Sequence, residues 1–99
     1  MTVIASVTLP GLTSEQYDQL RAAVGWLETA PEGGIVHMVW WDDGVARGVD
    51  AWESEAAFNT FGATRLAPAM AALGIQAELQ VTFYPAHEVY VPNAVTLTV

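Results

Sequence analysis

The chain has 99 residues, of which 53% are hydrophobic and 14% charged, so it is long enough for one domain with its own core. Its formal net charge is -8 and its only fixed cations are Arg21, Arg47 and Arg65, a balance that disfavours nucleic acid and anionic membrane surfaces as partners. There is no cysteine, which excludes disulfide bonds, thiolate metal sites and a cysteine nucleophile.

The first part of the chain predicts a strand and a helix. Residues 2–9 are apolar or β-branched at both parities, as in a strand that is covered on both faces, and a Pro-Gly pair ends it. Thr13 begins the sequence T-S-E-Q, a capping box at the start of a helix that runs to about Val24. Gly25 marks the end of this helix, and a loop rich in Pro and Gly follows.

Residues 35–53 predict a β-hairpin whose turn is Asp43-Gly44, because both central residues of a type I′ turn take positive φ. Residues whose numbers sum to 87 then oppose each other and share a face of the sheet. The expected pairs are His37 with Asp50, Asp42 with Val45, Trp41 with Ala46, Trp40 with Arg47, Val39 with Gly48, and Ile35 with Trp52. One face would therefore carry a histidine beside an aspartate, with a tryptophan on either side and small residues leaving room between them.

The rest of the chain predicts a second helix, a last strand and a tail. Ser54 can cap a helix that continues to about residue 73 and bends at Pro68. A strand over about residues 78–84 follows. We expect residues 1–89 to form the domain and residues 90–99 a C-terminal tail. The alternation of Val95, Leu97 and Val99 indicates an extra strand against a partner subunit, and a disordered end is the alternative.

The order β-α-β-β-α-β predicts a ferredoxin-like α+β fold, in which both helices cover one face of a four-stranded antiparallel sheet. The other face needs a cover. The strand from Ile35 to Trp41 is apolar at nearly every position, so the simplest cover is the same face of a second subunit in a twofold homodimer.

Several segments carry a resemblance to a known group of proteins. They read PGLT at residues 10–13, GIVH at 34–37, VDAWES at 49–54 and RLAPA at 65–69. With them, residues 2–89 resemble the dimeric α+β barrel superfamily, and within it the small antibiotic-biosynthesis-monooxygenase-like proteins. The resemblance implies a two-sheet barrel dimer with a pocket in each subunit between sheet and helices. It also implies cofactor-independent oxygenase or cyclase chemistry on polyketide-type aromatics.

The haem-degrading branch of this superfamily is disfavoured. That branch uses an Asn near the first strand, a Trp in the second helix and a His just after it. This chain has no Asn before Asn59, no Trp in its predicted second helix and no His between Met38 and Ala86. The two histidines and scattered carboxylates also give no metal-ligand spacing, so we expect neither a metal nor a cofactor.

His37 and Asp50 are the candidate catalytic residues. An imidazole gains and loses protons near neutral pH, which suits a general base, and an opposed carboxylate can hold one ring nitrogen and stabilise the protonated form. The motif lacks a nucleophile, so acyl transfer is not implied. Removing a proton from an acidic phenol or a β-dicarbonyl carbon needs only the base. The alternative is a partly buried histidine that is satisfied by its neighbour.

Aromatic residues are the candidate substrate-binding groups. Trp41 and Trp52 should lie on the His37 face, where they could hold a flat ring. Tyr17 and Phe61 come from the helices that would roof the pocket, and Tyr84 comes from the last strand. For each of them, a place in the core is the alternative.

The sequence thus leads to one main hypothesis and two alternatives. The main one is a cofactor-independent enzyme of monooxygenase or cyclase type, which acts on an apolar aromatic or polyketide-like molecule through a carbanion. The first alternative is a non-catalytic dimer that binds a hydrophobic ligand. The second is a structural dimer with a filled interior and no cavity beside His37. The amino terminus has no signal-peptide pattern, so we expect a cytoplasmic protein.

Overall fold

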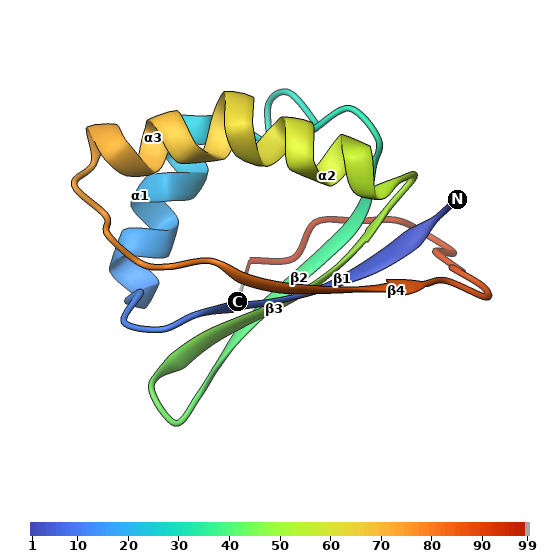
Figure 1. The fold of residues 1–99 in the computed structure, drawn as a ribbon, viewed down its shortest axis with the longest axis horizontal. Coiled ribbons are helices and arrows are strands. Elements are labelled where there is room, and N and C mark those ends of the chain that lie inside the picture. Colours follow the sequence, from blue (N-terminus) through green and yellow to red (C-terminus); the bar gives the residue numbers. More distant parts are fainter. Residues whose placement is uncertain (99) are drawn as a thin grey trace.

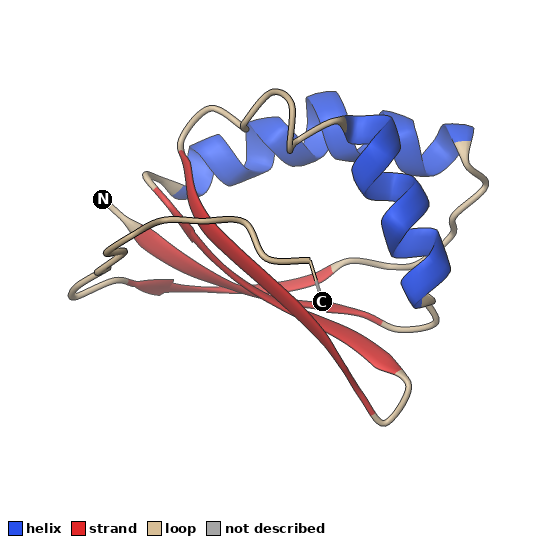
Figure 2. Ribbon diagram, turned by 180° about the vertical axis from the view of Figure 1, so that it is seen from behind, coloured by secondary structure: helices blue, strands red, loops and turns tan. Residues whose placement is uncertain are grey.

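A computed structural model describes residues 1–98 of the chain. Its elements in order are β1 (Val3–Leu9), α1 (Ser14–Val24), β2 (Gly34–Asp42), β3 (Val45–Trp52), α2 (Glu55–Phe61), the π-helical turn η1 (Gly62–Leu66), α3 (Ala67–Ala72) and β4 (Gln80–Pro85). They form two layers, with the helices packed over one face of a twisted sheet (Figures 1 and 2). No helix among the described residues is long and apolar enough to cross a membrane.

The sheet has the order β2-β3-β1-β4, and every neighbouring pair is antiparallel. This order is that of the ferredoxin-like fold, which confirms the predicted fold class. The two central strands, β1 and β3, are separated in the sequence by α1 and β2. The sheet therefore depends on contacts between distant parts of the sequence.

The β2–β3 hairpin has the predicted turn and, with one exception, the predicted register. Asp43 and Gly44 both take positive φ, 52° and 76°, as a type I′ turn requires. His37 opposes Asp50 as expected. The expected pairing of Ile35 with Trp52 is wrong, because a β-bulge between Gly34 and Val36 sets the glycine opposite the tryptophan. Sequence spacing alone does not reveal an extra residue of this kind.

Helix α1 begins and ends as its sequence predicts. The Thr13 side chain accepts a hydrogen bond from the backbone N–H of Gln16, and the Gln16 side chain accepts one from the N–H of Thr13. Gly25 takes the left-handed conformation, and its N–H donates to the carbonyl of Arg21.

The predicted second helix is divided into α2, η1 and α3. A proline inside an α-helix lacks a hydrogen bond, and its ring meets the carbonyl four residues earlier. In η1 the N–H of Ala67 bonds instead to the carbonyl of Gly62, five residues back, which widens this turn. Pro68 then falls in the first turn of α3, where its missing N–H costs little.

The core fills the space between the two layers in two adjoining clusters. The first contains Val3, Ala5, Val7, Trp52 and Phe58. The second contains Leu12, Tyr17, Leu20, Ala46 and Ile75. The outer face of the sheet is not covered within one chain, and it exposes the large side chains of Met38, Trp40 and Tyr84.

After β4 the chain turns back past the start of β1. The N–H of Ala86 donates to the carbonyl of Thr2, and residues 86–89 line a hollow with Thr2 and Ile35. Residues 90–98 form no strand and expose most of their side chains, including Val95 and Leu97. Val99, the last residue of the predicted alternation, lies outside the described residues.

Candidate active site

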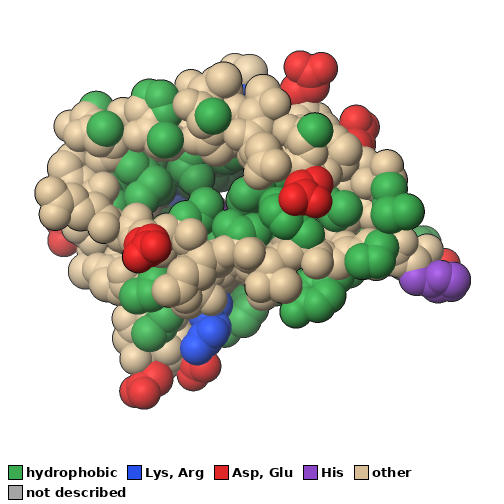
Figure 3. All heavy atoms as spheres, viewed as in Figure 1, with side chains coloured by type: hydrophobic (Ala, Val, Ile, Leu, Met, Phe, Trp, Pro, Cys, Tyr) green, Lys and Arg blue, Asp and Glu red, His purple; other side chains and the backbone are tan. Residues whose placement is uncertain are grey.

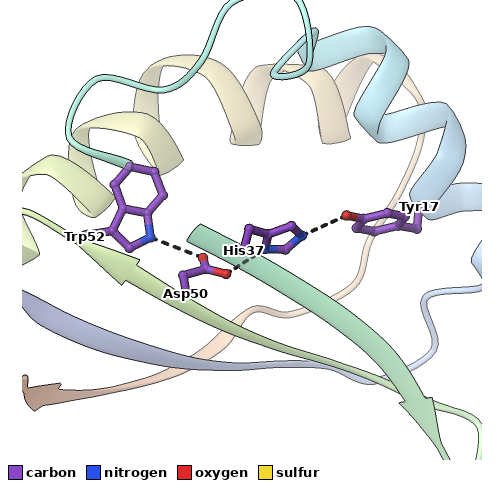
Figure 4. Close-up of polar contacts among 4 residues, drawn as sticks. All are labelled: Tyr17, His37, Asp50 and Trp52. Carbon is purple, nitrogen blue, oxygen red and sulfur yellow. Dashed lines mark hydrogen bonds and ion pairs between the residues drawn. The ribbon is translucent and has the colours of Figure 1, made fainter. Parts of the chain in front are cut away.

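A chain of hydrogen bonds crosses the inner face of the sheet below the helices (Figure 4). The Tyr17 hydroxyl lies 2.7 Å from Nε2 of His37, and Nδ1 of His37 lies 2.6 Å from Oδ1 of Asp50. The indole N–H of Trp52 donates to the other oxygen of Asp50 at 3.2 Å. Helix α1 supplies the tyrosine, β2 the histidine, and β3 the aspartate and the tryptophan. Three elements therefore meet in one polar cluster.

The direction of these hydrogen bonds follows from the protonated phenol of Tyr17 together with the carboxylate of Asp50, whose oxygens can only accept. Burial raises the pKa of Tyr17 to about 12, and the nearby carboxylates of Asp50 and Asp18 act in the same direction against the opposing charge of Arg21. The phenol therefore stays protonated at neutral pH, and it donates to Nε2 of His37 when the imidazole is neutral and Nε2 holds the lone pair. The ring proton of neutral His37 then lies on Nδ1, where it is donated to Asp50.

The two central residues differ in their access to solvent. The side chain of Asp50 is 10% exposed, whereas that of His37 is 41% exposed. A shielded carboxylate that accepts two hydrogen bonds is held in one orientation, while part of the imidazole surface is open to solvent although both ring nitrogens are hydrogen-bonded. Imidazole–carboxylate pairs of this kind also occur where a histidine acts as a general base.

Aromatic rings surround the imidazole on the helix side. The indole of Trp26, in the loop after α1, stands edge-on to His37 with centroids 5.8 Å apart, and it also contacts Tyr17 at 5.7 Å. Trp41 packs edge-on to Tyr17 at 5.8 Å and donates its N–H to the carbonyl of Leu12. Trp26 was not among the predicted site residues. A usable signal was its place directly after the helix-ending glycine, since apolar residues there fold back on the helix.

The loop that carries Trp26 is held by an arginine from the other helical segment. Nη2 of Arg65 donates to the carbonyls of Val24 at 3.1 Å and Thr29 at 2.8 Å. Arg65 belongs to η1, and π-helical turns are frequent at functional sites. The widened turn thus fixes the loop beside the imidazole.

The predicted site residues are only partly brought together. Tyr17, His37, Asp50, Trp41 and Trp52 all lie on the inner face, but Trp52 is 4% exposed and packs between Phe58 and Phe61. The ring of Trp52 belongs to the core, and its indole N–H donates a hydrogen bond to Asp50. Phe61 contacts Trp52 and has no ring contact with His37. Tyr84 lies on the outer face, where it is exposed and opposes Ile4.

A cavity lies beside this polar cluster rather than around it. It has a volume of about 510 Å³ and opens between the helical layer and β4, where Figure 3 shows a hollow with hydrophobic side chains. Its walls include Phe58, Leu66, Met70, Val81 and Phe83, and neither His37 nor Asp50 lines it. Its size falls within the usual range for small-molecule pockets.

The cavity and the polar cluster both lie against the inner face of the sheet. His37 opposes Asp50, Asp50 opposes Ala5, and Ala5 opposes Phe83, so these residues form one row across all strands. Because neighbouring strands lie about 4.8 Å apart, Phe83 is roughly 10 Å from Asp50. Small Ala5 stands between the cavity wall and the carboxylate.

Comparisons with known proteins identify the fold. No protein-family model matches the sequence, and no curated protein matches it. Among solved structures, a monooxygenase from ActVA-Orf6 of Streptomyces coelicolor, in complex with nanaomycin D, aligns at 21% identity with a TM-score of 0.59 over 92% of both chains. SnoaB, a cofactor-independent oxygenase from Streptomyces nogalater, aligns at 17% identity with a TM-score of 0.59 over 89% of this chain and 93% of that one. The chain shares the fold of these two proteins.

This fold by itself leaves the activity open. A protein of unknown function from Nitrosomonas europaea aligns with a TM-score of 0.68 at 18% identity, over 94% of this chain and 96% of that one. A shared fold does not fix an activity, which depends on the residues of the site.

Proposed function

We propose that the protein is a cofactor-independent enzyme that removes a proton from an apolar aromatic or polyketide-like small molecule. One observation carries this proposal: an accessible imidazole is hydrogen-bonded to a shielded carboxylate on the inner face of the sheet. His37 is the general base in this proposal, and Asp50 orients it and balances its charge after protonation.

The surroundings of His37 suit a flat, apolar substrate. Trp26 and Tyr17 place aromatic rings beside the imidazole, and Trp41 packs against Tyr17. Such rings stack well on planar ligands. The apolar cavity on the same face of the sheet can take the remainder of a larger ring system. Tyr17 and Trp41 are therefore kept as substrate-binding residues in this proposal.

Deprotonation leaves an anion with two possible fates. In an oxygenase, a carbanion reacts directly with O₂. For an anthrone, the CH₂ group becomes a carbonyl, and anthrone plus O₂ gives anthraquinone plus water. In a cyclase, the same carbanion attacks a carbonyl within the substrate. The resemblance in fold to SnoaB supports the oxygenase version.

We also propose that the protein is a homodimer joined through the outer face of the sheet. Met38, Trp40 and Tyr84 expose large apolar side chains on that face, more than a small monomer usually leaves in water. The exposed tail, with Val95 and Leu97, can add a further strand or cover to the partner.

The proposed activity can be tested with 1,8-dihydroxyanthrone, whose acidic CH₂ group lies across the central ring from the ketone and is conjugated with it once deprotonated. We expect oxygen uptake and anthraquinone absorbance to rise together in the presence of the protein. His37→Ala should lower turnover by about 10²–10⁴-fold, and Asp50→Asn should lower it as well, because general base catalysis typically contributes that much. His87→Ala, which changes the other histidine, should have no effect. Full turnover in both His37→Ala and Asp50→Asn would contradict the mechanism.

A non-catalytic binding function is the second candidate, and the position of the cavity favours it. The cavity walls are apolar apart from Asn59, and the base is not among them. Nanaomycin D, the ligand in the Streptomyces coelicolor structure, is a suitable probe. Binding alone would quench tryptophan fluorescence both in the unaltered protein and in His37→Ala, and the ligand would be recovered unchanged. Ala63→Trp, which fills the cavity, should abolish the quenching.

A further inference from the structure

Both ring nitrogens of His37 are already occupied within the protein. Nε2 accepts the hydrogen bond of Tyr17 at 2.7 Å, and Nδ1 donates to Asp50 at 2.6 Å. No lone pair of the imidazole is left for a substrate proton. A substrate must therefore either displace the phenol of Tyr17 or give its proton to the phenol oxygen.

Displacement of Tyr17 is opposed by its packing. Tyr17 is 8% exposed, and its ring packs against those of Trp26 and Trp41. The guanidinium of Arg21 lies 5.9 Å from the centroid of the Tyr17 ring. Helix α1, which carries Tyr17, is fixed by its capping box and by the buried Leu20. Moving the ring away would expose part of the core. The phenol oxygen, in contrast, can still accept a hydrogen bond while it donates to His37.

We infer that Tyr17 is a catalytic residue that touches the substrate and relays its proton to His37. The inference rests on the proposed function. The acidic proton of the substrate passes to Oη of Tyr17 while the proton of Tyr17 passes to Nε2 of His37. The electron pair of the broken bond stays on the substrate as an anion. His37 becomes an imidazolium, whose charge is balanced by Asp50, and the protons return by the reverse route.

The geometry of the cluster supports transfer in a single step. Burial raises the pKa of Tyr17 to about 12, which disfavours a separate tyrosinate intermediate and favours movement of both protons together along the two short hydrogen bonds. The N–H of Trp52 keeps the far oxygen of Asp50 in place, so the carboxylate remains aimed at Nδ1. A hydroxyl proton suits this route best, because an O–H group can hydrogen-bond to Oη. The favoured substrate class is therefore a phenol or an enolised β-dicarbonyl.

The relay can be tested with Tyr17→Phe, which keeps the ring and removes the oxygen, in the 1,8-dihydroxyanthrone assay. We expect turnover to fall by about 10²-fold or more. Tyr90→Phe, a change of an exposed tyrosine in the tail, should leave turnover unchanged. Near-ultraviolet circular dichroism checks that Tyr17→Phe is folded. If Tyr17 only occupied the base, its removal would free His37 and raise turnover. Unchanged or raised turnover overturns the relay.

A second measurement needs no variant. In mixtures of H₂O and D₂O, a step that moves two protons gives a curved dependence of rate on deuterium fraction. A step that moves one proton gives a straight line. We expect a curve for the unaltered protein, and a straight line overturns the relay. His37→Ala separates the two claims: loss of turnover there without loss in Tyr17→Phe rejects the relay alone, whereas full turnover in His37→Ala rejects the proposed function itself.

Discussion

Tyr17 links the acid–base state of one side chain to the stability of the whole domain. Its pKa is about 12 in the folded protein, against 10.0 for an ordinary tyrosine. Between these pH values the unfolded chain binds fewer protons than the folded one. The free energy of unfolding must therefore fall as pH rises from 10 to 12, whereas the contribution is fully present below pH 10.

We expect urea unfolding midpoints to show this fall, and Tyr17→Phe to remove part of it. The phenylalanine variant has no proton to lose at this position, so its slope between pH 10 and 12 should be shallower. The two proteins are compared at matched pH and salt. Equal slopes in both proteins would mean that Tyr17 is not the group responsible.

The pairing of His37 with Asp50 could be predicted because a two-residue turn sets the register of everything behind it. The bond from Tyr17 to His37 could not be predicted in the same way. It joins residues 20 positions apart and depends on how α1 is rotated above the sheet. The position of Trp26 depends on the path of a loop, and the hydrophobic periods of strands (two residues) and helices (about 3.6 residues) do not describe loops.

At the scale of elements, the end of the loop after α1 is closely fitted to α2. Gly33 has a φ of +82°, and a Cβ added there would lie 2.7 Å from the Cβ of Ala57. Its carbonyl accepts a hydrogen bond from the N–H of Glu53 at 2.8 Å. The backbone conformation and the lack of space both require glycine at this position.

We expect Gly33→Ala to lower the free energy of unfolding by about 1–3 kcal/mol, the usual cost of a strained backbone position. Gly62→Ala is the matched control. Gly62 has a helical φ of -58° and open space around its Cα, so alanine there should stabilise by about 0.4–1 kcal/mol. Urea denaturation of the three proteins measures both changes. A neutral Gly33→Ala would show that the loop can move away from α2.

The division of the second helix shows what a sequence pattern can hide. The capping serine and the apolar stripe predicted one helix with a bend at Pro68. Phe61 and Leu66 are five positions apart in the sequence. Residues with this spacing share one face of a helix only where the turn between them is widened to a π-helical turn. The signal was present, but a search for spacings of three and four does not register it.

At the scale of the whole molecule, one sheet face is buried by the chain itself and the other is not. The four strands and their order follow from alternation and turns, and both were predicted. The position of the cavity was not, because it depends on how the helical segments spread above β4. Tyr84 was predicted to lie near the pocket because it belongs to the last strand. Side chains alternate between the faces of a strand, however, and Tyr84 points to the outer face with Ile4.

The proposed dimer makes a prediction about that outer face. Trp40 is 45% exposed there, and a glutamate in its place would bring a charge into the interface. We expect sedimentation equilibrium to give twice the 10.6 kDa chain mass for the unaltered protein and the chain mass for Trp40→Glu. Leu27→Glu, in the exposed loop after α1, should remain dimeric. A monomeric unaltered protein at micromolar concentration would rule the interface out.

The turn at Asp43-Gly44 constrains how this protein can diverge. Side chains on a strand alternate between faces, so a one-residue slip of β2 against β3 would turn His37, Val39 and Trp41 to the outer face together. Many single substitutions in the turn would leave that register intact, whereas one inserted residue could remove the site and part of the core at once. In this hairpin, length should be under stronger selection than identity.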